Sequence, residues 1–255
     1  MVFNMEIVLL TALGVGGATV IGAAVGFAFK GLSHKFSDVV LSFAAGIMLA
    51  AAVLGLIIPS VESGGDLGVL YAVIGIAVGA VCMKLVDVLV PHLHKMADQD
   101  IESHKRNNAI DKVMLFVLAI AIHNLPEGIA AGVGFGSGNT AEALVIAGGI
   151  ALQNIPEGMV IIAPMLATGM KPRKTFMIAA LTGLIEVVGT FIGYLAVSVA
   201  SAILPFALSF AGGTMLYVIS DEMIPETHSH GAESAATFAL IIGFCLMLVF
   251  DHLLA

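Results

Sequence analysis

A six-residue phrase occurs twice in the chain, as HNLPEG at residues 123–128 and as QNIPEG at residues 153–158. In each copy, a side chain that can bind a metal ion, His123 or Gln153, precedes a glutamate, Glu127 or Glu157, by four positions. Residues four apart share one face of a helix. Each copy therefore presents a nitrogen or amide group and a carboxylate in one direction, which predicts a metal site between two helices.

The composition is that of a membrane protein. Of 255 residues, 59% are hydrophobic and 11% are charged, and the mean hydropathy is +1.07, whereas a soluble domain is about 25% charged. The first residues lack a basic segment and lead directly into an apolar span, so no signal peptide is expected. No basic run suited to nucleic acid is present.

Eight segments are long and apolar enough to cross a bilayer, which takes about 20 residues. They form a single transmembrane transporter domain over residues 1–255, with one longer polar loop at residues 92–111. The expected spans are 5–29, 37–59, 67–91, 112–135, 141–168, 174–200, 203–224 and 233–253.

The basic residues predict the orientation, because Lys and Arg gather in cytoplasmic loops. Nine of the ten basic residues fall in the loops after the first, third and fifth spans, which lie on one side of the membrane. The loops on the other side have none. We therefore expect these three loops to face the cytoplasm and both termini to lie outside, in a plasma membrane of the prokaryotic inner-membrane type.

The two phrases lie at mid-membrane depth. His123 is about 16 Å from the start of its span at a rise of 1.5 Å per residue, and Gln153 is at a similar depth from the other side. An ionised side chain at this depth costs at least about 2.5–3.5 kcal/mol. Within the spans that hold Glu127, Glu157 and Glu186, basic residues stand only at the cytoplasmic edges. A divalent cation or protonation must therefore neutralise these acids.

The side chains also restrict the choice of ion. Imidazole with carboxylates suits zinc, iron, manganese and related metals, and no cysteine is placed to select a softer ion. Calcium and magnesium favour more oxygen ligands and no imidazole. Glu127 and Glu157 are placed to bridge two ions, with Asn124, Asn154 and Glu186 completing the second position. The ion is expected to be transported substrate, Zn²⁺ or also Fe²⁺, Mn²⁺ or Cd²⁺, and no catalytic cofactor is expected.

The eight spans, the loop after the third span and the paired phrases resemble the ZIP (Zrt/Irt-like) metal-transporter family. Glutamine at the start of the second phrase, where many members have histidine, is similar to the GufA-type branch. The resemblance implies that His123, Glu127, Gln153 and Glu157 hold the first metal, and that Met48 lies near it. It places Asn124, Asn154 and Glu186 at the second position, although some members have aspartate where this chain has Asn154.

The same resemblance implies an architecture and a partner. The fold is an all-α polytopic membrane protein with eight transmembrane helices, in which inverted three-helix repeats (spans 1–3 and 6–8) surround spans 4 and 5. Family members are commonly homodimers within the lipid bilayer. A rigid-body, elevator-like movement of the metal-bearing helices fits inverted-repeat logic.

Further polar residues lie near the ends of the last two spans. Charges at a helix end are often only solvated, but those inside the apolar run favour an exit route for metal. Asp251 is placed near the outer face, where it would line an entrance. The exit and entrance candidates are Asp221, Glu222, His228, His230 and Asp251.

The sequence thus predicts a transporter that moves divalent transition metals into the cytoplasm and not an enzyme. One alternative is a membrane-embedded zinc hydrolase, which needs an open metal position and a general base; no HExxH phrase is present. Another is a proton-coupled carrier of an organic solute, because the same buried acids would serve it.

Overall fold

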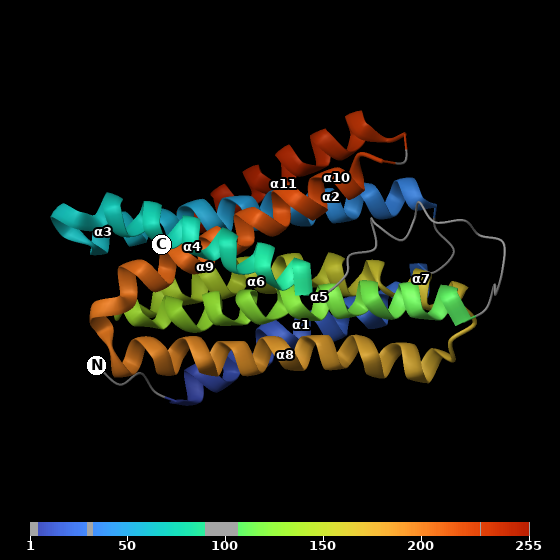
Figure 1. Ribbon diagram of the computed structural model, residues 1–255, viewed down its shortest axis with the longest axis horizontal. Coiled ribbons are helices and arrows are strands. Elements are labelled where there is room, and N and C mark those ends of the chain that lie inside the picture. The colour runs from blue at the N-terminus through green and yellow to red at the C-terminus, as the bar shows by residue number, and fades with distance from the viewer. Residues whose placement is uncertain (1–4, 30–32, 90–106, 230, 255) are drawn as a thin grey trace.

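The computed structural model describes residues 5–29, 33–89, 107–229 and 231–254, and within these ranges every regular element is a helix (Figure 1). Five spans are single helices: α1 (Met5–Phe29), α4 (Gly68–Leu89), α5 (Asn107–Gly134), α8 (Pro172–Val199) and α11 (Glu233–Leu254). Three spans are composite, namely α2 (His34–Ala50) with η1 (Ala51–Ile57) and α3 (Ile58–Ser63), α6 (Thr140–Val160) with α7 (Ile162–Ala167), and α9 (Leu204–Val218) with η6 (Ile219–Met223) and α10 (Ile224–Thr227). Short 3₁₀ turns join spans at η2 (Gly65–Leu67), η4 (Phe135–Ser137) and η5 (Ser201–Ile203).

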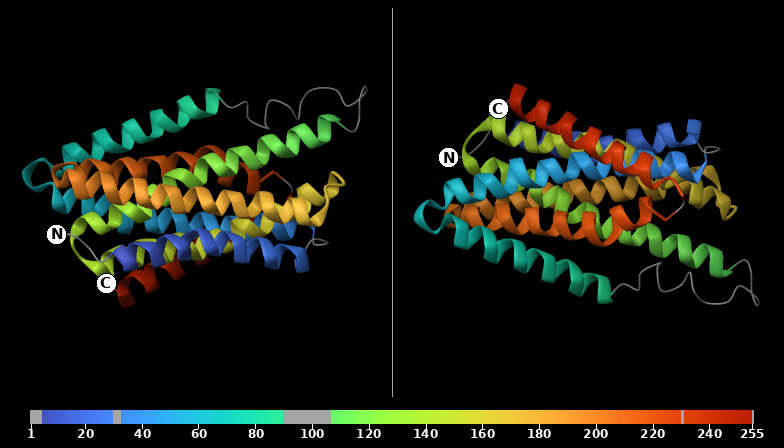
Figure 2. Two further views of the ribbon diagram at one scale, coloured as in Figure 1. Left: turned by 90° about the horizontal axis from the view of Figure 1, so that it is seen from below. Right: turned by 90° about the horizontal axis from the view of Figure 1, so that it is seen from above.

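The helices have the length and surface of membrane spans. Seven of the helices in the described ranges are long and apolar enough to cross a bilayer. Helix α5 is 28 residues long, the same length as α8. The start of α1 and the end of α11 lie at the same end of the molecule, as an even number of crossings requires (Figure 2). The outward face of α4 is apolar, which suits lipid rather than water; it exposes Val69, Leu70, Val73, Ile74, Val78, Val81 and Leu85.

The spans form two bundles. In one, which we call the motif bundle, α5 packs along α8, and α1 packs along both α6 and α8. In the other, which we call the outer bundle, α4 packs along α9 and α2 packs along α11. Figure 1 shows the motif bundle in its lower part and the outer bundle in its upper part. Both copies of the repeated phrase, on α5 and α6, lie in the motif bundle.

The packing confirms the inverted arrangement. Span 1 corresponds to span 6, span 2 to span 7, span 3 to span 8 and span 4 to span 5. Under this exchange the pair α1–α6 becomes α8–α5, the pair α2–α11 becomes α9–α4, and the pair α1–α8 becomes itself. The repeat is also visible in sequence, as SFAAGIML at residues 42–49 and SFAGGTML at residues 209–216. Ser42 Oγ donates to the Ala236 carbonyl on α11, and Ser209 Oγ donates to the Tyr71 carbonyl on α4. Each repeat then enters a π-helical segment, η1 or η6.

Glycines bring helix backbones together within each bundle. A Cβ added at Gly22 of α1 would lie 2.1 Å from the Ile155 carbonyl oxygen of α6. In the outer bundle, a Cβ at Gly46 of α2 would lie 1.9 Å from the Leu240 carbonyl oxygen of α11. Small residues allow such close approach in lipid, where hydrophobicity alone does not bring helices together. The helices inside each bundle are therefore joined backbone to backbone.

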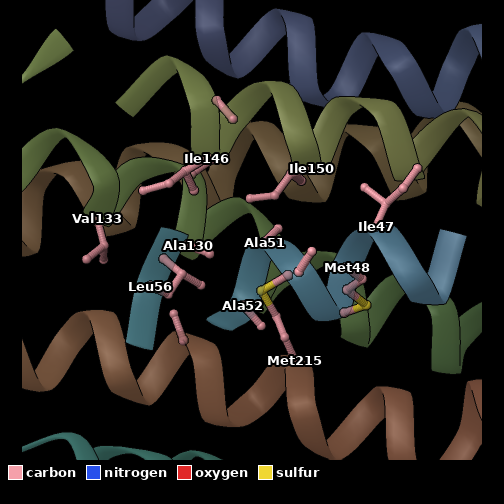
Figure 3. Packing of buried hydrophobic residues seen from close by; sticks show 14 of the residues in the cluster. Ile47, Met48, Ala51, Ala52, Leu56, Ala130, Val133, Ile146, Ile150 and Met215 are labelled. Carbon is pink, nitrogen blue, oxygen red and sulfur yellow. The ribbon is translucent and has the colours of Figure 1, made fainter. Parts of the chain in front are cut away.

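Side chains fill the contact between the two bundles. Figure 3 shows Ala51 from the outer bundle near Ile150 of the motif bundle, with Met215 entering from α9. The atoms nearest to a Cβ added at Gly149 of α6 would be side-chain atoms, from Met247 and Ala51. At Gly149 the bundles therefore meet through side chains, whereas the helices inside each bundle meet at their backbones.

Candidate functional site

The two phrases place their polar side chains in the protein interior at mid-span. On α5, His123, Asn124 and Glu127 are buried, and on α6, Gln153 and Asn154 are buried. Glu157, one turn beyond Gln153, is half-buried. α5 continues through Pro126 to Gly134, and the interruption in the fifth span comes at Ile161, five residues after Pro156. The prolines therefore leave both motif faces on continuous helix.

Glu186 on α8 lies at the centre of a hydrogen-bonded group. Its Oε1 accepts from Asn124 Nδ2 at 2.5 Å and from Thr19 Oγ1 at 2.6 Å, and its Oε2 accepts from Asn154 Nδ2 at 2.5 Å. Asn154 Nδ2 also lies 3.3 Å from the Val15 carbonyl oxygen. The structure thus brings together the three residues that the sequence assigned to a second position, and adds Thr19 from α1.

Several buried oxygens of the two phrases have no hydrogen-bond partner within the described part of the chain. Each belongs to an amide or carboxyl group, and a buried acceptor left without a partner costs about 1–3 kcal/mol. A cation, a bound water or a protonated carboxyl group would each give such oxygens a partner. The atoms are Asn124 Oδ1, Glu127 Oε2, Gln153 Oε1, Asn154 Oδ1 and Glu157 Oε1.

The glutamates of this site are also near one another. The carboxyl groups of Glu157 and Glu186 lie close enough to Glu127 to repel its charge, and the Gln153 amide lies beside Glu127. Because Glu127 is fully enclosed, water does not screen this repulsion. The site therefore favours either a cation between its acids or protonation of one of them.

His123 takes a contact that the spacing alone does not indicate. Its Nε2 lies 3.0 Å from Glu222 Oε1 on η6, so the imidazole of the motif bundle reaches the outer bundle. The described residues hold no group of three or more His, Cys, Asp or Glu side chains close enough to bind one ion. Two features account for this: His123 lies against Glu222, and amides supply many of the oxygens.

The remaining candidates lie in different surroundings. Met48 is part of the apolar layer between the bundles. Asp221 is exposed and accepts from the Tyr217 hydroxyl at 3.1 Å, while Asp251 is half-buried near the end of α11. His230 lies outside the described residues. Among the candidate exit residues, Glu222 contacts a motif helix, through His123.

His228 joins α10 to α11. Its Nδ1 lies 2.8 Å from the Ile224 carbonyl oxygen and its Nε2 lies 3.0 Å from Thr237 Oγ1. The Thr237 hydroxyl donates in turn to the Glu233 carbonyl. Both ring nitrogens are thus engaged with the turn between the last two spans, which favours a structural role for this histidine.

We expect His228→Ala to lower the thermal midpoint of unfolding by several degrees, because two contacts worth about 1 kcal/mol each are lost. Zinc uptake per folded molecule should stay at the parent level. His252 is an exposed histidine on α11, so His252→Ala is the matched control. It should change neither the thermal midpoint nor the zinc uptake. Loss of uptake in His228→Ala at an unchanged midpoint would instead make this residue a ligand on the exit route.

The fold and the site agree with comparisons to known proteins. A family model described as ZIP zinc transporter matches residues 94–251. A zinc transporter named GufA from Myxococcus xanthus is 38% identical over 249 residues, which cover 95% of this chain and 97% of the relative. The chain belongs to the ZIP zinc transporter family.

Other members of the ZIP family match with similar coverage. The zinc transporter ZIPB of Bordetella bronchiseptica is 34% identical over 92% of this chain and 77% of its own length. The zinc transporter ZupT of Chlorobaculum parvum is 32% identical over 97% of this chain and 96% of its own length. These relatives are named as transporters, so the hydrolase alternative is not favoured.

Proposed function

We propose that this ZIP-family protein moves Zn²⁺ into the cytoplasm, and Fe²⁺, Mn²⁺ or Cd²⁺ as related substrates. The ion passes through the site formed by Glu127, Glu157 and Gln153, with His123 as a further ligand. The observation that carries this proposal is the set of partnerless oxygens on the two phrases, buried at mid-membrane depth. Residues 113–170 and 175–255 contain no Lys or Arg, so no basic side chain from these segments neutralises the acids.

The donor set suits an ion that must be released. Carboxylate, amide and imidazole groups bind divalent metals of the zinc type, and no cysteine lies in either phrase. Thiolates would bind zinc more tightly and slow its departure. A site of mixed oxygen and nitrogen ligands therefore fits transport better than storage.

The packing supports a movement of one bundle against the other. The proposed ligands of the ion belong to the motif bundle, whose helices are joined by backbone contacts such as that of Gly22 with Ile155. The layer between the bundles is lined by side chains, as at Gly149. We propose that the motif bundle carries its ion as a rigid body across this layer, in the manner of an elevator. The His123–Glu222 contact then joins the two bundles in one of the positions.

The setting follows from the distribution of charge. We propose the inner membrane of a prokaryotic cell as its location. Both termini would lie outside and the loop at residues 92–111 in the cytoplasm, because nine of the ten basic residues lie in or next to the connections on that side. Two copies pair within the bilayer as a homodimer. Apolar faces such as that of α4 contact lipid or the second copy.

Zinc flux across a membrane tests the proposal directly. Purified protein in liposomes loaded with a zinc-sensitive dye should give uptake that stops when zinc is chelated outside, and that Cd²⁺, Fe²⁺ and Mn²⁺ reduce by competition. Protein-free liposomes supply the background. Flux no greater than that background would contradict metal transport, and solute transport that persists after chelation would support the proton-coupled carrier.

A further inference from the structure

We infer that this site holds one divalent ion at a time. Thr19, Asn124 and Asn154 donate hydrogen bonds to the carboxylate oxygens of Glu186, which a second ion would otherwise bind. The inference rests on the proposed function, since it concerns the number of ions at the proposed transport site. It assigns to Thr19 a role that the repeated phrases do not indicate, and it makes Glu186 a residue that orients ligands.

The hydrogen bonds around Glu186 come from three different helices. Thr19 is on α1, Asn124 is on α5 and Asn154 is on α6, and all three donate to the one carboxylate. Glu186 is fully buried, and so is Thr19 to within 2% of its surface. A buried carboxylate that accepts three hydrogen bonds is stabilised without a cation. The carboxyl group of Glu186 therefore has hydrogen-bond partners on both of its oxygens without a metal ion.

The identity of residue 154 decides this arrangement. A carboxylate accepts hydrogen bonds only, so the Asn154 amide must turn its Nδ2 toward Glu186. An aspartate at the same place would present a second negative charge 2.5 Å from Glu186, and only a cation or a proton would make that contact favourable. Asparagine supplies the hydrogen bond instead, so the place of the second cation is taken by an N–H group.

The same hydrogen bonds fix the other ends of the two amides. Because Asn124 and Asn154 each point Nδ2 at Glu186, their Oδ1 atoms point elsewhere, and both Oδ1 atoms are without a partner within the described residues. These neutral oxygens belong to the same two phrases as Glu127 and Glu157 and are free to accept from, or bind to, a further group. Glu186 acts on the ion through them, as a positioning residue, and Thr19 holds Glu186 in place.

The number of bound ions tests the inference. Purified full-length protein in nanodiscs is dialysed against buffer in which Cd²⁺ is the sole added metal. The bound cadmium per chain is then measured by elemental mass spectrometry. The same measurement on a Glu127→Gln/Glu157→Gln double variant gives the ions held elsewhere, such as at loop histidines. We expect the parent to exceed the double variant by one ion and Asn154→Asp to exceed it by two.

Thr19 variants and a spectrum separate positioning from mere packing. Thr19→Val keeps the shape of the side chain but removes the donor, so a second, weaker ion should appear, whereas Thr19→Ser should keep a single ion. With ¹¹³Cd, the site should give one resonance in the parent and in Thr19→Ser, and two in Asn154→Asp. Thermal midpoints show that each variant is folded.

Three results would overturn the inference. Two site-dependent ions in the parent would show that the hydrogen bonds on Glu186 do not exclude a second ion. One ion in a folded Asn154→Asp variant would show that residue 154 does not control the count. No difference between the parent and the double variant would remove the proposed transport site itself, and this outcome is distinct from the other two.

Discussion

Zinc uptake should fall about 100-fold or more when Glu157 is replaced by glutamine, and Glu127→Gln should have the same effect. Each change removes one negative charge from a site where Glu127 and Glu157 are the carboxylates left for the ion. Removing one partner of a buried ion pair typically costs about 3–5 kcal/mol, and each 1.4 kcal/mol is a factor of about ten in binding. Initial rates of dye-detected uptake in liposomes measure the loss.

A glutamate away from the site provides the control for this experiment. Glu62 lies on α3 and is exposed, so Glu62→Gln makes the same chemical change without touching the motif bundle. Its uptake should equal that of the parent. If Glu157→Gln is folded, as judged by its thermal midpoint, and still transports zinc at the parent rate, then the ion does not use this carboxylate and the proposed site is wrong.

Replacing Gly22 with alanine should sharply reduce the amount of folded protein. The added methyl group would lie 2.1 Å from the Ile155 carbonyl oxygen, and a backbone atom cannot rotate away as a side chain can. Helix α1 must then separate from α6, which disturbs the bonds from Thr19 and Asn154 to Glu186. Overpacking typically costs about 1–3 kcal/mol, and contact with backbone lies at the upper end. The fraction that survives heating, measured by size-exclusion chromatography, reports the effect.

Two other glycines make this result specific. Gly17 lies on the same helix with no atom within 4 Å of an added Cβ, so Gly17→Ala should be neutral or stabilising by about 0.5–1 kcal/mol. Gly149 lies between the bundles, where an added Cβ meets the flexible end of Met247, so Gly149→Ala should fold. Equal losses at Gly22, Gly17 and Gly149 would contradict the distinction between backbone packing within a bundle and side-chain packing between bundles.

These two experiments examine different parts of one mechanism. The glutamate variants test whether the ion binds at the repeated phrases, and the glycine variants test whether the helices that carry those phrases form a rigid unit. A carrier that moves its site across the membrane needs both properties. Loss of uptake in Glu157→Gln together with the expected order of the glycine variants would support the elevator-like movement.

The sequence predicted the overall fold well, because the signals for membrane helices are local. A long apolar segment must satisfy its backbone hydrogen bonds internally in lipid, and a helix does so within one segment. The eight helical spans of the structure accordingly lie close to the apolar segments. The internal repeat of residues 42–49 and 209–216 gives a weaker signal, because it consists mainly of small apolar residues without obvious chemistry.

Prediction of the site was uneven for a related reason. The spacing of His123 and Glu127 placed both on one helix face. Asn124, Asn154 and Glu186, which the sequence assigned to a second ion, contact one another directly through hydrogen bonds. Thr19 was missed, since a lone threonine in an apolar helix gives no signal of its partner. The contact of His123 with Glu222 was also missed, although each residue was a candidate separately.

The sequence by itself determined which side chains share a helix face and that buried acids at mid-membrane depth need a positive partner, because helix geometry and the cost of burying charge depend on residues near in the chain. Only the tertiary structure decided that Glu186 is held by Thr19 and two asparagines, and that His123 reaches Glu222. Those contacts depend on how each helix is rotated and how closely its backbone approaches the next. Gly22 allows such an approach to the backbone carbonyl of Ile155, and Gly128 to that of Glu186. In each case the two residues are far apart in the sequence.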